Sequence, residues 1–124
     1  MEDETSSSWV RSLRSVYQAH ESGSPQYRLH LWHALFSTPT YTANFSPPEH
    51  THHTYTNPAT IDLVINRALS KSYTSVLPAE EKEALEKKMR AVLEEARERG
   101  ELVVGEDGGI EYPYRTEVVV CRRK

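Results

Sequence analysis

LPAEEKEALEKKMRAVLEEARERG, residues 77–100, is the clearest secondary-structure signal in the chain. Pro78 suits the start of a helix, glutamates fill the following turns, and arginines precede Gly100, an order that complements the helix dipole. Apolar residues recur at helical spacing and predict one buried face, made of Leu85, Met89, Val92, Leu93 and Ala96. The pairs Glu83–Lys87 and Glu86–Arg90 lie one turn apart, so we expect the charged residues to form a solvated face.

The final stretch, GGIEYPYRTEVVVCRRK (residues 108–124), predicts a β-strand from Ile110 to Arg122 after a turn at residues 106–109. Pro113 interrupts this strand and indicates a bulge or a sheet edge there. Residues 118–120 are three valines, apolar on both faces, which is typical of a strand buried inside a sheet. A further short strand is expected at residues 102–104. So small a sheet is not enough to bury the valine run.

Two helices are expected near the N-terminus. The first covers residues 7–20, and Ser6, Ser7 or Ser8 can cap it. The second starts with Ser24 as its cap, has proline at its first position, and extends to residue 36.

The middle of the chain predicts a loop, a strand and a third helix. Residues 37–49 are rich in Thr and Pro and predict a loop. Residues 51–56 are dense in β-branched and aromatic residues and predict a short strand. A third helix is expected to follow Thr56 or Asn57 as its cap, with Pro58 at its first position.

Composition sets the broad class of the protein. The chain has 124 residues, 37% hydrophobic and 27% charged, as expected for one globular domain. A net charge of -3 argues against a dedicated nucleic-acid binder. The single cysteine, the acidic N-terminus and the lack of a long apolar run predict a cytoplasmic protein without an internal disulfide.

Several segments, taken in order, resemble class I S-adenosylmethionine-dependent methyltransferases that act on small molecules. The matching segments are Trp9-Val10, Pro25-Gln26-Tyr27-Arg28 with Trp32, RALSKSY at residues 67–73, LPAEE at residues 77–81, and YPYRTEV at residues 112–118. Together they cover nearly the whole chain. They resemble the part of the family's domain that follows its fifth strand.

The resemblance implies an α/β fold, or α+β for this part alone: about four helices on a small antiparallel ribbon. The ribbon would correspond to strands six and seven of the family's seven-stranded sheet, with strand seven lying between strands five and six. The chain is then a partial domain over residues 1–124: cap helices at 1–36, loop and strand at 37–58, two helices at 59–99, and turn and strand at 100–124. Glu2-Asp3 resembles the acidic pair that commonly follows strand five, so we expect a chain that begins just after that strand.

The resemblance also implies S-adenosylmethionine as the cofactor of the complete enzyme. The family binds it with a glycine-rich turn after strand one, because close approach of the backbone excludes a side chain. Here Gly23 is the only glycine before Gly100, and the later glycines follow the long helix. No cofactor-binding or catalytic residue is therefore assigned, and we expect no methyl transfer by this chain alone.

Five residues are expected to line a substrate pocket, because helices around strand six cover that pocket in the family. Trp9 and Trp32 would be apolar walls, Tyr55 and Tyr73 would offer hydroxyl groups, and Arg67 would hold an acidic group of the substrate. The alternative is that the tryptophans are core residues and the arginine is a surface cation.

Other chemistry has weaker support. His30 and His33 share a helix face, and His50 and His52 share a strand face, but no acidic or cysteine ligand lies at a motif spacing, so no zinc or nickel site is predicted. Cys121 has no local histidine to activate it and is expected to be inert. Two alternative functions remain open: a non-catalytic remnant or accessory subunit that pairs, or self-associates, through a sheet edge, and a small-molecule-binding module.

Overall fold

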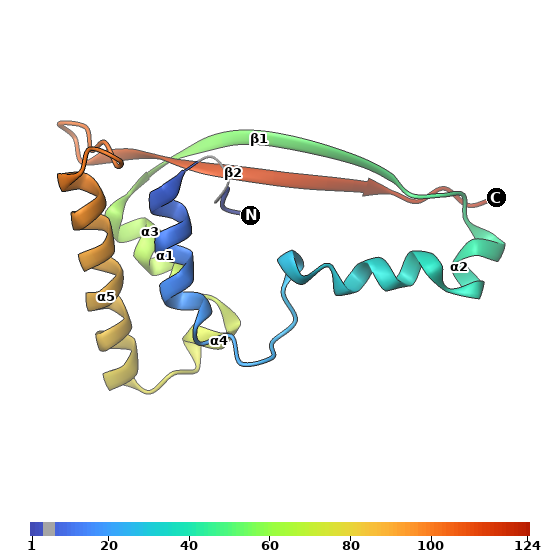
Figure 1. The fold of residues 1–124 in the computed structure, drawn as a ribbon, viewed down its shortest axis with the longest axis horizontal. Helices are drawn as coiled ribbons and strands as arrows, with labels where there is room; N and C mark the ends of the chain where they lie inside the picture. The colour runs from blue at the N-terminus through green and yellow to red at the C-terminus, as the bar shows by residue number, and fades with distance from the viewer. Residues whose placement is uncertain (4–6) are drawn as a thin grey trace. The chain divides into compact units, whose positions relative to one another are not determined.

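The computed structural model describes residues 1–3 and 7–124. The elements follow in the order α1 (Ser8–Gln18), η1 (Tyr27–Leu29), η2 (Leu31–Ser37), α2 (Pro39–Asn44), β1 (Glu49–Thr60), α3 (Ile61–Leu69), α4 (Ser72–Ser75), α5 (Ala79–Glu98) and β2 (Gly109–Val120) (Figure 1). The two strands form a two-stranded antiparallel ribbon, so the fold is mixed α/β. None of the helices in the described ranges is long and apolar enough to cross a membrane.

The chain divides into two compact units, each of which holds a part of both strands. Unit 1 contains residues 1–22 and 54–115, and unit 2 contains residues 23–53 and 116–124. Each unit is described below by itself.

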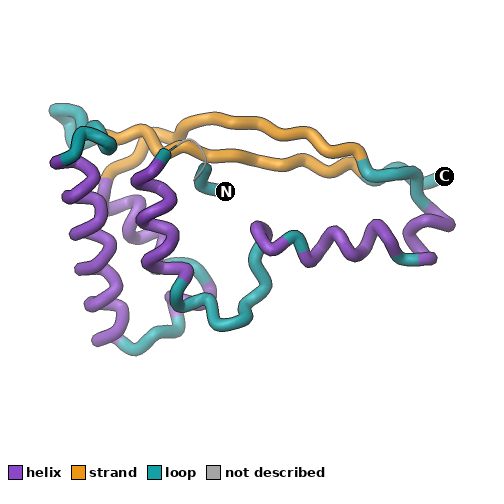
Figure 2. Tube along the Cα trace, in the orientation of Figure 1, coloured by secondary structure: helices purple, strands orange, loops and turns teal. Residues whose placement is uncertain are grey.

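Unit 1 contains the main hydrophobic core. Its helices α1, α3 and α5 lie on one face of its part of the ribbon (Figure 2), and α5 packs against both α1 and α3. Leu85, Met89, Leu93 and Ala96 of α5 are buried, which confirms the predicted buried face except for the partly exposed Val92. Burying each large apolar side chain stabilises the unit by about 1.5–3 kcal/mol. The core is completed by Trp9, Val10, Leu13, Tyr17, Val64, Ile65, Ala68, Leu102, Ile110, Tyr112 and Tyr114.

Residues 1–3 pair with β2 in unit 1. The Asp3 amide donates to the Pro113 carbonyl at 2.8 Å, the Arg115 amide donates to the Met1 carbonyl at 2.7 Å, and Glu2 forms an antiparallel bridge with Tyr114. The N–H and C=O of one strand residue point to the same edge. The missing N–H of Pro113 therefore falls on the edge of β2 that residues 1–3 occupy, and it costs no hydrogen bond to β1. Thus β2 has β1 along one edge and residues 1–3 along the other.

Unit 2 consists of its part of the ribbon together with η1, η2 and α2. Beyond Pro47-Pro48 the ribbon continues as an antiparallel bridge between Phe45 and Arg123. The Ser46 amide donates to the Arg122 carbonyl at 2.8 Å and strengthens this bridge. Aromatic contacts then connect α2 and η2, since Phe36 packs edge-on against Tyr41 with ring centroids 5.1 Å apart.

Two helical predictions in unit 2 are wrong. The expected helix over residues 24–36 is two 3₁₀ segments, because His30 between them has φ +53, a left-handed conformation that a helix cannot continue. The expected loop over residues 37–49 contains α2. The Thr38 hydroxyl accepts from the Tyr41 amide at 3.2 Å, and Pro39 occupies the first helical position. A cap followed by proline was thus present in the sequence and was missed.

The predicted boundary between strand and third helix is also wrong. The strand does not stop at Thr56 but continues to Thr60, whose hydroxyl accepts from the Leu63 amide at 3.2 Å and caps α3. Pro58 therefore lies in β1 rather than at the start of a helix. The first helix is confirmed within two residues at each end. Ser7 occupies its cap position, but the Ser7 side chain makes no capping hydrogen bond; Ser6, also considered as a cap, lies outside the described residues.

The C-terminal part confirms the final strand and corrects two details. Residues 102–104 are irregular rather than a strand. The valine run is not buried: Val118 is 43% exposed and Val120 is 38% exposed. The reason is that, among the described residues, this part of β2 has only β1 beside it, and a two-stranded ribbon leaves faces and an edge in solvent.

Candidate functional site

The five predicted pocket residues are divided between the units. Trp9, Tyr55, Arg67 and Tyr73 belong to unit 1, and Trp32 belongs to unit 2. Within unit 1, Arg67 and Tyr55 meet at the same ring, that of Tyr114. Trp9 and Tyr73 contribute to the packing of the core.

Trp9 is a core residue that also lines a cavity. Its side chain is 4% exposed and stacks on Tyr112, with ring centroids 5.5 Å apart. A cavity of ≈ 490 Å³ lies beside it, with Glu101, Asp107 and Glu111 in its lining. The Asp107 carboxylate accepts the Gly109 amide at 2.9 Å, so this acid stabilises its own turn. Trp9 is therefore a core residue that also borders a cavity.

A buried carboxylate is the centre of the charged group in unit 1, which we call the Glu2 cluster: Glu2, Arg14, Arg67, Lys71 and Tyr114. The Glu2 side chain is 2% exposed, and its Oε1 accepts from Arg67 Nε at 2.9 Å. Lys71 Nζ lies 3.5 Å from the same oxygen. The backbone carbonyl of Glu2 accepts from Arg14 at 3.0 Å. Arg67, expected to hold an acidic group of a substrate, thus pairs with a carboxylate of its own chain.

The electrostatics of the Glu2 cluster favour the ionised carboxylate. Burial opposes ionisation and raises the pKa of Glu2, but Lys71, a backbone hydrogen bond and Arg67 together outweigh burial and hold this pKa below its usual range. A carboxylate of this kind stays charged at neutral pH, which makes it a poor general acid or base. The arrangement is suited to binding charge rather than to proton transfer.

Tyrosine rings form the apolar walls of the Glu2 cluster. The Arg67 guanidinium lies 5.0 Å from the centroid of the Tyr114 ring, a cation–π geometry. Tyr55 stacks on the same ring with centroids 5.7 Å apart. Burial raises the pKa of the Tyr17 hydroxyl, and the nearby Glu2 carboxylate raises it further. That hydroxyl is buried without a hydrogen-bond partner among the described residues.

A second carboxylate, that of Glu117, contacts aromatic residues of unit 2. The Glu117 side chain is 5% exposed, and its Oε1 lies 2.6 Å from His50 Nδ1. The Tyr27 hydroxyl donates to its other oxygen, and His52 Nε2 lies 4.0 Å from Oε1. The hydrogen bond from Tyr27, followed by that from His50, lowers the pKa of Glu117.

Trp32 packs within this aromatic group. Its ring stacks on Tyr27 at 5.8 Å between centroids and meets His33 edge-on at 4.1 Å. It also lies 6.2 Å from His50 on the ribbon. Trp32 is half-buried by these rings, and no residue of η2 is fully buried. Over residues 1–3 and 7–124, no group of three or more His, Cys, Asp or Glu side chains is arranged to hold a metal ion.

Sequence reasoning missed Glu2, Lys71 and Glu117. Glu2 was noted only for its resemblance to an acidic pair, and its burial depends on a partner 65 residues away. Glu117 could have been found from the sequence, because it lies in a predicted strand. A charged strand residue whose side chain is buried needs a hydrogen-bond or ion-pair partner.

The residues present do not fit S-adenosylmethionine, the cofactor that the resemblance implies. Strand β1 ends at Thr60 and α3 begins at the next residue, so no glycine-rich turn joins them. A Cβ added at Gly105 or at Gly109 would lie 2.9 Å from the Asp107 carboxylate. These two glycines therefore make room for a side chain of their own turn rather than for a ligand.

No protein-family model, no curated protein and no solved structure matches this chain.

Proposed function

We propose that this chain is the substrate-side, C-terminal portion of a class I S-adenosylmethionine-dependent methyltransferase acting on a small molecule. In this proposal the chain does not bind the cofactor by itself. It would supply groups that position the substrate, and catalysis in the complete enzyme would then rest mainly on positioning.

The strand arrangement of unit 1 carries the proposal. Residues 1–3 and β1 both run antiparallel to β2 and lie on its two edges. They therefore run parallel to each other with β2 between them. The resemblance implies that strand seven lies between strands five and six, so residues 1–3, which would directly follow strand five, lie on the expected edge of β2. The ordered sequence segments between residues 9 and 118 support the same proposal independently of that geometry.

The Glu2 cluster supports a role in binding a charged group of a small molecule. Arg67 and Lys71 converge on one carboxylate beside the Tyr114 ring. Cations beside an aromatic wall are suited to the carboxylate or phosphate of a small molecule. In this chain Glu2 fills that position.

A chimera tests the proposal. The cofactor-binding part of a class I small-molecule methyltransferase, ending with its fifth strand, is joined ahead of Met1, and thermal unfolding is followed by calorimetry. If residues 1–124 complete the sheet, the chimera unfolds in one cooperative transition. Two independent transitions, each matching one part alone, would contradict the proposal.

Exposed valines favour one other function, pairing with another protein as an accessory subunit. Val118 and Val120 are both more than a third exposed, and an open strand edge is a template for another strand. Light scattering of wild type and of the Val118→Thr/Val120→Thr double variant tests this function. Association that rises with concentration and is lost in the variant supports it, and a monomer at all concentrations contradicts it.

A further inference from the structure

The C-terminal segment of β2 has an open edge in unit 2. The Arg122 carbonyl accepts from the Ser46 amide at 2.8 Å, so the backbone of Arg122 faces the chain that leads into β1. The backbone groups of neighbouring strand residues point to opposite edges. The N–H and C=O groups of Glu117, Val119 and Cys121 therefore face away from β1. We call residues 117–121 the edge segment.

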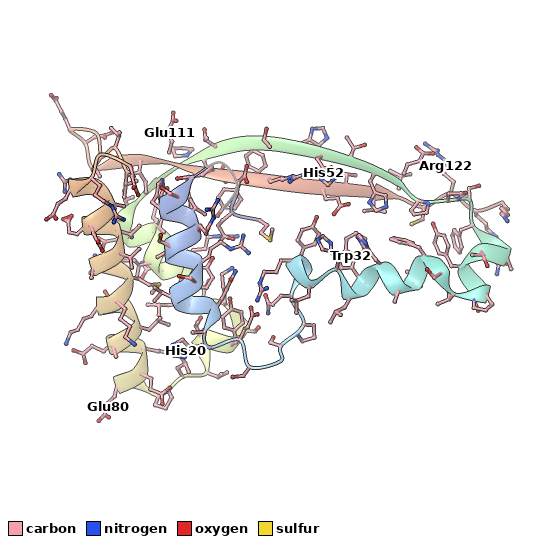
Figure 3. All side chains as sticks on the ribbon, in the orientation of Figure 1. His20, Trp32, His52, Glu80, Glu111 and Arg122 are labelled. Carbon is pink, nitrogen blue, oxygen red and sulfur yellow. The ribbon has the colours of Figure 1, made fainter. Side chains whose placement is uncertain are left out.

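In the described ranges, no other strand pairs with the edge segment. The sheet consists of β1 and β2, and the pairing of residues 1–3 with β2 ends at Arg115. Figure 3 labels Arg122, which lies just beyond the C-terminal end of β2 and of the edge segment. A row of unpaired N–H and C=O groups at a strand edge is a template for another strand.

The edge segment lacks the features that usually prevent strand addition. It contains neither proline nor lysine, and its sequence EVVVC is rich in β-branched residues. Its one charged residue, Glu117, is 5% exposed at its side chain and contacts His50 and Tyr27 within unit 2. A strand added at this edge therefore meets apolar side chains rather than an exposed charge.

A second copy of the same segment is a good match for this edge. In an antiparallel pair of two copies centred on Val119, this residue lies opposite itself, and Val118 lies opposite Val120 of the other copy. All three outward-facing residues then pair, with about six backbone hydrogen bonds between the copies. Val118 and Val120 are 43% and 38% exposed, and each gains an apolar cross-strand neighbour. No two like charges lie opposite each other within the pair, and any shifted register leaves an outward-facing residue unpaired.

We propose that the edge segment is the interface of a two-fold symmetric homodimer, in which β2 pairs with β2 of a second copy about Val119. Such an interface is isologous, so it closes as a dimer rather than growing into a filament. One short strand pair is a small interface, so we expect a dimer that dissociates on dilution. The proposal rests on the pairing function given above, names its partner, and is independent of the methyltransferase proposal.

Disulfide trapping tests the register of the pair. Cys121 is exposed and is the chain's one cysteine, so Cys121→Ser gives a background without thiols. Val119→Cys in this background places two thiols on opposed residues, whose Cα atoms are about 5.5 Å apart in such a pair and can form a disulfide. Val118→Cys is the matched control, because Val118 is exposed but does not lie opposite itself. After oxidation with glutathione, we expect at least about fivefold more covalent dimer from Val119→Cys than from Val118→Cys.

A proline variant of the full chain tests the interface without a disulfide. Val119→Pro removes an outward-facing N–H and no hydrogen bond to β1, as Pro113 does beside residues 1–3. In sedimentation equilibrium, the mean mass of wild type should rise with concentration, and that of Val119→Pro should stay at the monomer value. Wild type that is monomeric at all concentrations would overturn both the dimer and the pairing function. Association that persists in Val119→Pro, or equal trapping of Val118→Cys and Val119→Cys, would overturn this interface alone.

Discussion

Replacing Glu2 with glutamine tests whether the buried carboxylate fastens residues 1–3 to the helices of unit 1. The variant keeps the size of the side chain and removes its charge. Breaking a buried ion pair costs about 3–5 kcal/mol when one partner is lost. The cost here should be smaller, because Arg67 is 46% exposed and Lys71 is 25% exposed, so both cations regain water. Glutamine also keeps one acceptor oxygen for Arg67. We expect a loss of about 2 kcal/mol in the free energy of unfolding, or about 8 °C in Tm.

The assay is urea unfolding at several pH values, with Glu83→Gln as the control. The exposed Glu83 pairs with Lys87 on α5 at 3.3 Å, with both side chains at least 70% exposed, so its loss should cost less than about 0.5 kcal/mol. The pKa of Glu2 is lowered in the folded state from an ordinary value of 4.5. Its stabilisation is therefore fully present above that value and is lost as the pH falls through the lower, folded pKa. The difference between wild type and Glu2→Gln should shrink below pH 4.5. A variant as stable as wild type at pH 7, or a difference that is the same in acid, would refute the reasoning.

Three further changes have expected outcomes. Met89→Ala removes a fully buried side chain of α5 and should lower the free energy of unfolding by about 2–5 kcal/mol in a urea titration, since a cavity remains; a loss under 1 kcal/mol would contradict the assigned core. Thr60→Ala removes the cap of α3 and should cost about 1 kcal/mol, whereas Thr60→Ser should cost much less because it keeps the oxygen that accepts from Leu63; equal losses would argue against the cap. Tyr27→Phe removes the strongest contribution to the lowered pKa of Glu117, so this pKa should rise toward 4.5 in an NMR titration of the carboxyl group, and an unchanged pKa would count against the hydrogen bond.

Helix α5 was predictable because everything that forms it is local. Its dipole order and its apolar repeat lie within one continuous segment, and the pairs Glu83–Lys87 and Glu86–Arg90 occur as expected. The same local rules failed at two prolines. Pro39 begins a helix and Pro58 lies in a strand, although each follows a residue able to cap a helix. The difference is long-range, because pairing with β2 keeps β1 extended to Thr60.

The charged sites were less predictable than the fold. Arg67 was selected as a residue that binds an acidic group, and it does bind a carboxylate, but Glu2 supplies that carboxylate from a position 65 residues away. Glu117 meets His50 across 67 residues. Spacing along the sequence carries no signal for such pairs, since strand register and helix packing create them.

We propose that this chain is the part of a methyltransferase that does not hold the cofactor. Isothermal titration of S-adenosylmethionine into residues 1–124, beside a complete class I methyltransferase as positive control, tests it most directly. We predict no saturable heat for this chain at cofactor concentrations up to about 1 mM, which bounds any binding free energy to weaker than about -4 kcal/mol. Saturable binding with a micromolar Kd would contradict the claim.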